Sequence, residues 1–216
     1  MRRHHTAAEL RRRLPRLLFG LVLCGFGIAL MVAGDLGLGP WDVLHQGLSN
    51  RIGLPIGTVT IAVGALVMLL WLPLRERPGL GTVLNVLLIG IVLDLTLLVL
   101  DTPESLVLRA AMMLTGPLVF GIGTALYIGA GLGPGPRDGV MTGLARRGLP
   151  IAAVRTAIEL TALGGGWLLG GTAGFGTIVF AFGVGPVVHW ALPRLTVAEL
   201  PPEAEALVDD GLVTGR

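Results

Sequence analysis

The sequence predicts an all-α polytopic membrane protein with six transmembrane helices, arranged as two inverted-topology repeats of three. Composition, the lengths of the uncharged segments and an internal repeat lead to this prediction. Hydrophobic residues make up 53% of the 216 residues, only 14% are charged, and the mean hydropathy is +0.80. Because soluble domains carry about 25% charged residues, this composition argues against a soluble enzyme, a disordered chain and a nucleic-acid-binding module.

Six stretches are long and apolar enough to cross a bilayer, which takes about 20 mainly apolar residues per helix. The predicted spans cover residues 17–34, 55–74, 79–100, 106–130, 150–169 and 174–192. The last two share one uncharged run, from Leu160 to Pro193, that would form a helix of about 50 Å if it did not break. We expect the break in the glycine-rich stretch between Gly164 and Gly174.

Arginines predict the orientation of these spans. The chain has no lysine, and its arginines gather in the N-terminal tail, at residues 75–77, at residues 137–147 and at Arg194. The alternate connections hold only Arg51 and Arg109, among acidic residues. The positive-inside rule therefore predicts that both termini lie in the cytoplasm. Tryptophans near the predicted helix ends suggest an aromatic belt at the two interfaces: Trp41, Trp71, Trp167 and Trp190.

An internal repeat divides the chain into two halves. Residues 25–48 and 121–144 are identical at 11 of 24 positions with an offset of 96 residues. Each half contains three predicted spans, and because three is odd, the second half must insert upside down, as in many secondary transporters. The expected organisation is a basic cytoplasmic tail, a first repeat, an inverted second repeat and an acidic cytoplasmic tail, over residues 1–16, 17–101, 102–194 and 195–216.

Each half also carries a Gly-x-Gly-Pro-x-Asp motif after its first span, at 37–42 and 133–138. Proline suits the first position of a helix, and an aspartate in the first turn complements the helix dipole. We therefore predict a short extra helix in each half, over 40–51 and 136–147. The pattern leaves open whether these helices lie flat or dip into the membrane.

These two motifs carry a resemblance to a known family. Gly-Leu-Gly-Pro-Trp-Asp-Val-Leu-His-Gln-Gly-Leu, its echo Gly-Pro-Gly-Pro-Arg-Asp-Gly-Val-Met-Thr-Gly-Leu, and the Gly-Thr pairs at 81–82 and 176–177 resemble the YczE-type bacterial membrane proteins, of the YczE/YyaS/YitT group. The resemblance extends over about residues 17–195. It implies a multi-pass plasma-membrane protein and does not imply a particular activity.

Charged residues within predicted spans are costly and tend to be functional or paired. Arg155 and Glu159 are four residues apart on one helical face, where they can neutralise each other, and Asp94 stands alone in an apolar run. Asp42 and Asp138 occupy equivalent places in the two motifs and are either helix-start residues or ligand-site carboxylates. Trp41 and its counterpart Arg137 are interpreted as an interface anchor and a topology charge. Asn85 and Thr60 are further polar candidates.

The expected function is transport of a small solute, at a site between the repeats where Asp94, Arg155 and Glu159 coordinate substrate or a coupling proton. The alternative is a non-transporting regulatory, scaffold or substrate-binding subunit of a larger complex. No catalytic motif, cofactor or metal site is expected, and the single cysteine, Cys24, excludes an internal disulfide. Expected partners are the lipid bilayer, a small solute, and either a second copy or another membrane subunit. Substrate, coupling ion and oligomeric state are left open.

Overall fold

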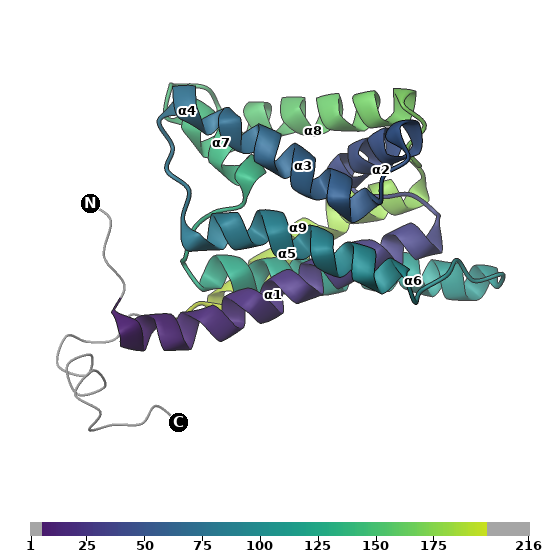
Figure 1. Ribbon diagram of the computed structural model, residues 1–216, viewed down its shortest axis with the longest axis horizontal. Helices are drawn as coiled ribbons and strands as arrows, with labels where there is room; N and C mark the ends of the chain where they lie inside the picture. Colours follow the sequence, from purple (N-terminus) through teal and green to yellow (C-terminus); the bar gives the residue numbers. More distant parts are fainter. Residues whose placement is uncertain (1–5, 198–216) are drawn as a thin grey trace.

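The structure is a computed structural model that describes residues 6–197, and these residues are helical apart from short connections. Figure 1 shows a bundle in which most helices run along one common direction. The helices in chain order are α1 (Ala7–Gly34), α2 (Pro40–Ile52), α3 (Ile56–Leu69), α4 (Trp71–Leu74), α5 (Leu80–Leu97), α6 (Leu106–Gly129), α7 (Pro136–Ala145), α8 (Ile151–Leu168) and α9 (Phe175–Leu195). The all-helical prediction is therefore confirmed for this part of the chain.

Five helices are long and apolar enough to cross a membrane: α1, α3 continued by α4, α5, α6 and α9. Four of them match predicted spans to within three residues. α1 contains the predicted span 17–34 but begins at Ala7, so most of the predicted N-terminal tail, residues 1–16, is helical. The sixth, α8, has 18 residues but is less apolar, because it carries Arg155 and Glu159. The long uncharged run breaks between Leu168 and Phe175, as predicted, although Gly164, Gly165 and Gly166 lie inside α8 rather than at the break. Gly166 lies against the backbone of α2 at Leu44, where a side chain would collide. This glycine therefore allows a close helix crossing and does not mark the break.

The centre of the bundle is the antiparallel pair of α1 and α6, which pack more extensively than any other two helices. Glycines let their backbones approach closely. A Cβ at Gly20 would lie 2.7 Å from the carbonyl oxygen of Gly123, and a Cβ at Gly27 would lie 2.7 Å from that of Gly116. Small residues at helix crossings have this effect in membrane proteins generally. The sulfur of Cys24 lies between the two contacts, 3.7 Å from the carbonyl oxygen of Phe120.

Each of these two helices also caps the other. Arg13 Nη1 near the start of α1 donates to the carbonyl oxygen of Ala130, which follows α6, at 2.9 Å. Arg109 Nε near the start of α6 donates to the carbonyl oxygen of Gly34, at the end of α1, also at 2.9 Å. The two arginines are 96 residues apart, as are the two acceptors. Both satisfy carbonyls that a helix end leaves unpaired, so their side chains have a structural role beyond the topology charge.

Each Gly-x-Gly-Pro loop also contacts the other half, because the residue before the loop accepts a hydrogen bond from the first turn of a helix there. The amide of Gly176, in the first turn of α9, donates to the carbonyl oxygen of Leu36 at 2.8 Å. The amide of Gly81, in the first turn of α5, donates to the carbonyl oxygen of Leu132 at 2.9 Å. Gly37 and Gly133 have φ values of +116° and +133° and pack against the backbones of Gly174 and Gly79, so a side chain at either position is excluded twice over.

The two predicted short helices exist, as α2 and α7, and both begin inside the bundle. A Cβ at Gly39, just before α2, would come within 2.9 Å of the Phe180 ring, more than one turn into α9. The far end of α2 reaches the α8–α9 connection, where Asn50 donates to the carbonyl oxygen of Gly170 at 3.1 Å. α7 ends instead beside α4, at the opposite end of α3 (Figure 1). The two helices therefore dip into the bundle from opposite ends and do not lie flat.

The two halves differ in one seam, that is, in the interface between the second and the third long helix of each half. In the first half α3 packs closely along α5, where Gly57 and Gly90 meet backbone to backbone. Their counterparts 95 residues later belong to α8 and α9, which are not among the helix pairs that pack closely. Gly185, the counterpart of Gly90, has no atom near the space that a side chain would fill. The α3–α5 seam is thus closed and the α8–α9 seam is open.

The expected aromatic belt is only half present. Trp167 and Trp190 are exposed at helix ends, at 66% and 59%. Trp71 is 2% exposed, because its ring covers Gly139 of α7 and its Nε1 donates to the carbonyl oxygen of Pro136 at 2.9 Å. Trp41 is also drawn inward. The prediction was wrong for these two tryptophans because position near a helix end does not reveal which helices dip inward.

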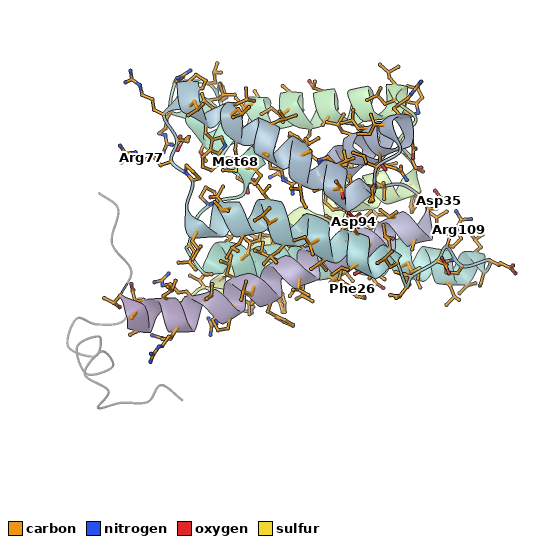
Figure 2. All side chains as sticks on the ribbon, viewed as in Figure 1. Phe26, Asp35, Met68, Arg77, Asp94 and Arg109 are labelled. Carbon is orange, nitrogen blue, oxygen red and sulfur yellow. The ribbon has the colours of Figure 1, made fainter. Side chains whose placement is uncertain are left out.

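Charged side chains lie at both ends of the bundle. Figure 2 shows Asp35 and Arg109 together at one end and Arg77 near the other. At the end of Arg77, Arg146 pairs with Glu76, and Arg147 donates to the carbonyl oxygen of Pro73. The beginning of α1 and the end of α9 lie together, since Arg16 donates to the carbonyl oxygen of Leu195 at 3.3 Å. The predicted acidic tail, residues 195–216, falls almost wholly outside the described residues.

Candidate functional site

Two cavities lie between the halves, and four side chains form their common wall: Trp41, Phe120, Tyr127 and Arg137. The smaller cavity, of about 80 Å³, lies on the side of α3 and α5. The larger cavity, of about 370 Å³, lies between α8 and α9 and extends to His189 and Leu192 near the end of α9. The two cavities differ in volume because α3 and α5 pack closely and fill most of the space between them, whereas the equivalent space between α8 and α9 stays empty.

Trp41 and Arg137 reach this wall from the first turns of α2 and α7, one residue after the helix-starting prolines. The Arg137 guanidinium lies 5.9 Å from the centre of the Phe120 ring, and Phe120 in turn packs against Phe180 with ring centres 5.1 Å apart. The Trp41 ring lies 6.3 Å from the ring of His45. Because both short helices start inside the bundle, the two residues of one repeat position meet at the centre.

Asp42 and His45 form a buried pair on α2. Asp42 is 5% exposed and His45 is 7% exposed, and both line the smaller cavity. His45 Nδ1 lies 3.5 Å from Asp42 Oδ1, and no other polar atom of the described residues approaches this nitrogen closely enough for a hydrogen bond. Thr60 and Asn85, the further polar candidates, line the same cavity.

Asp138 has a different partner from Asp42. The Tyr127 hydroxyl donates to Asp138 Oδ2 at 3.0 Å, and both side chains line the larger cavity. The two aspartates are therefore placed on either side of the common wall, each in the first turn of its helix. Both roles considered from the sequence are compatible with this placement, since each residue starts a helix and also faces a cavity.

Arg155 and Glu159 pair with each other, with Nε and Oε1 3.0 Å apart, and they line the larger cavity. Their side chains are 62% and 32% exposed, so the pair is less enclosed than the sequence suggested. The pair is exposed because α8 packs against α2 and α7 and not against α9, which leaves the α8–α9 seam open. The counterparts of these residues in the first half are Thr60 and Gly64, which face the smaller cavity.

Asp94 is not brought together with the Arg155–Glu159 pair and lines neither cavity. Its carboxylate accepts the amides of Gly57 and Thr58 at 2.6 and 2.8 Å and the Thr58 hydroxyl at 2.9 Å. Figure 2 places it where α5 meets the beginning of α3. Asp94 therefore acts as an N-cap supplied from another helix, and it holds the α3–α5 seam closed.

Sequence reasoning underrated Trp41 and Arg137, which the structure places in the common wall. The signal that could have found them is their place in the two repeated motifs, one residue after each helix-starting proline. Among the described residues, no group of three or more His, Cys, Asp or Glu side chains could hold a metal ion. The site can offer one guanidinium, one indole N–H and an aromatic wall to a ligand.

Comparison with known proteins agrees with the resemblance found in the motifs. A family described as of unknown function (DUF6198) matches residues 11–193. An uncharacterized protein of Haemophilus influenzae is 42% identical over 186 residues, which cover 86% of this chain and 84% of the relative. The uncharacterized membrane protein YczE of Bacillus subtilis is 35% identical over 178 residues, with 81% and 83% covered, and YyaS of the same organism is 27% identical over 181 residues, with 81% and 89% covered. No solved structure matches the chain. The chain belongs to this family, the YczE-type bacterial membrane proteins.

Proposed function

We propose that the protein is a small-solute transporter whose two halves form an inverted repeat around the central cavities. The observation that carries the proposal is the larger cavity, which is open along the α8–α9 seam while the equivalent space behind the α3–α5 seam is almost filled. In an inverted-repeat transporter, the two halves exchange conformations when the site changes its accessibility. One closed and one open seam is the difference that such a cycle requires.

The reciprocal contacts support the inverted repeat. Arg13 and Arg109 cap each other's helices, and the loops before α2 and α7 bind the beginnings of α9 and α5. Each contact recurs with its partners exchanged between the halves at offsets of 95 or 96 residues. A twofold axis in the membrane plane, passing near Cys24 and Phe120, accounts for all of them. On this view α8 is the sixth span, and its charged residues face the cavity.

The arginine distribution supports cytoplasmic termini. The end of the bundle with the beginning of α1, Arg77, Arg146 and Arg147 is then the cytoplasmic end. The larger cavity extends toward this end, through His189 and Leu192. The structure then corresponds to a state open toward the cytoplasm, in which the Asp94 cap closes the opposite end.

Closure of the α8–α9 seam can be tested by cross-linking. Ala152 and Gly185 are the counterparts of Gly57 and Gly90, which are in contact in the closed seam. Ala152 has the Cβ that Gly57 lacks, so α8 and α9 would close at a wider separation than α3 and α5, which suits the Cα distance of about 4.4–6.8 Å that a disulfide spans. With Cys24 replaced by alanine, the pair Ala152→Cys and Gly185→Cys should form a disulfide under mild oxidation. The matched control is Ala152→Cys with Gly183→Cys, because Gly183 is the counterpart of a residue outside the Gly57 contact.

Transport itself is tested by solute flux in proteoliposomes that contain this chain alone. Flux should stop when the 152–185 disulfide forms and return on reduction. A disulfide that forms equally in the control pair would show random collision rather than closure and would contradict the proposed cycle. If solute binds but no flux occurs under any condition, the transport proposal is wrong and the alternative, a substrate-binding membrane subunit, is favoured.

A further inference from the structure

The charged side chains of the two cavities differ in how closely they are partnered. Arg155 is paired with Glu159, Asp138 with Tyr127, and Asp42 with His45. Arg137 lines both cavities and makes neither an ion pair nor a hydrogen bond with any residue between 6 and 197. Its guanidinium lies 5.9 Å from the centre of the Phe120 ring, and the carboxylates of Asp138, Asp42 and Glu159 attract its charge without a direct ion pair. A guanidinium has five N–H donors, and here they are available to a ligand.

A second donor in the same wall is also unused. Trp41 Nε1 is buried and has no hydrogen-bond partner in the described part of the chain. Leaving a buried N–H unpaired is costly, so such groups are usually met by a ligand or water. Trp41 and Arg137 stand at equivalent positions of the two repeats and face the same two cavities. Both are donors, and neither can accept a hydrogen bond, so they favour an acceptor with negative charge.

The rest of the larger cavity has a polar part, with Thr124, Asp138 and His189, and an apolar part. Beside the common wall it is lined by side chains from α6 and α9, among them Ile128, Phe180, Val184 and Val188. An inorganic anion would gain nothing from these surfaces, whereas the body of an organic acid would cover them. The Arg155–Glu159 pair bounds the cavity on the side of α8 and is already neutralised.

We propose that the cavity binds small organic anions, with the carboxylate on Arg137 and Trp41 and the apolar body against Phe120 and Phe180. This proposal rests on the proposed transport function only for the direction in which the ligand moves; the binding site stands on the cavity alone. A planar guanidinium takes a carboxylate through two parallel hydrogen bonds, and lysine cannot reproduce this geometry. The indole N–H adds a third donor.

The test measures binding of three molecules of the same size and different charge to the purified full chain: benzoate, benzamide and benzylamine. Benzoate should bind at least tenfold more tightly than the other two. Arg137→Gln should lower benzoate affinity at least tenfold, and Arg137→Lys should lower it less. Trp41→Phe keeps an aromatic ring and removes only the N–H, so it should weaken benzoate a few-fold. Arg77→Gln is the matched control, since it makes the same change at an exposed arginine that lines neither cavity.

Preference for benzylamine or benzamide, or an Arg77→Gln variant that loses benzoate as fully as Arg137→Gln, would overturn the proposal. Failure of all three molecules to bind to the folded wild-type chain would overturn it as well, because the site would then not accept an aromatic body. Variants are compared only after their unfolding temperatures show that they fold. Benzoate binding without benzoate flux in proteoliposomes would contradict the transport function and leave this proposal intact, whereas flux of a neutral or cationic solute alone would do the reverse.

Discussion

Replacing Asp94 should loosen the closed seam by an amount that can be worked out from its three hydrogen bonds. Asp94→Ala removes acceptors for the amides of Gly57 and Thr58 and for the Thr58 hydroxyl. Loss of an N-cap costs about 0.5–2 kcal/mol, and hydrogen bonds to a charged acceptor are at the upper end of that range. We expect a loss of about 2 kcal/mol, which for a chain of this size lowers the unfolding temperature by about 4–8 °C.

Asp94→Asn should cost about half as much, because the amide keeps one acceptor oxygen but turns an NH₂ group toward the helix start. Thr58→Ala removes one hydroxyl and should cost the least, about 0.5–1 kcal/mol. The assay is thermal unfolding of the purified chain in detergent, followed by tryptophan fluorescence. The control is Asp101→Asn, the same chemical change at an exposed acid near the same end of the bundle.

The loss of stability should be largest for Asp94→Ala, smaller for Asp94→Asn and smallest for Thr58→Ala, and Asp101→Asn should have no effect. An Asp94→Ala variant as stable as the wild type would refute the capping role. Asp94 was first considered as a ligand for a solute or proton. If the capping role is its main one, Asp94→Asn should leave benzoate affinity unchanged, because Asp94 lines neither cavity.

Three further predictions use other contacts. Glu159→Gln alone should destabilise the chain more than Arg155→Met and Glu159→Gln together, because the single change leaves a charge without its partner; equal unfolding temperatures would show that the two side chains do not depend on each other. Arg13→Gln and Arg109→Gln should each lower the unfolding temperature by a similar amount, since each removes one of two equivalent helix caps; a much smaller effect at Arg13 would contradict their equivalence. A reporter enzyme fused after Arg216 should be active in the cytoplasm, and a periplasmic signal would exclude the proposed orientation.

The sequence was most informative where one local rule decides the structure. Apolar run lengths predicted the helices, and the Gly-Pro-x-Asp motifs predicted α2 and α7 to within a few residues. The break before α9 was also expected, but its position was not. Gly166 lies within α8 because it packs on α2, and this contact joins residues more than 100 positions apart. Glycine content alone cannot distinguish a break from a close helix crossing.

Side-chain roles that depend on long-range contacts were not predicted. An isolated aspartate in an apolar run was considered as a ligand, and the structure gives Asp94 the beginning of another helix as its partner. Arg109 was counted only as a topology charge, and it caps α1. Trp41 was assigned to the interface because it stands near a helix end. In each case the missing information was which helix or helix end lies beside the side chain, and hydrophobic periodicity does not encode this.

Two pairs of equivalent residues distinguish the seams: Ala152 has a side chain where Gly57 has none, and His189 replaces Asp94. Asp94 in α5 caps α3, and its counterpart in α9 is His189, which lines the open cavity. A carboxylate offers two oxygens to the amides at a helix start. A neutral imidazole offers one acceptor, and a protonated imidazole offers none and is repelled by the positive end of the helix dipole. The α8–α9 seam therefore lacks the interaction that holds the α3–α5 seam closed.

His189→Asp should supply that interaction. In the closed seam the new carboxylate would accept the amides of Ala152 and Ala153, the counterparts of Gly57 and Thr58. We expect closure to become more favourable, so the disulfide between Ala152→Cys and Gly185→Cys should form faster than it does with His189, by about tenfold for a cap of about 1.4 kcal/mol. If the protein transports as proposed, solute flux should fall, because a transporter held in one state cannot complete its cycle. His189→Asn offers one oxygen and should give an intermediate rate. Equal cross-linking rates in all three variants would show that the seam is controlled elsewhere, and the open cavity would then have to be explained by the glycines of α8 and α9 alone.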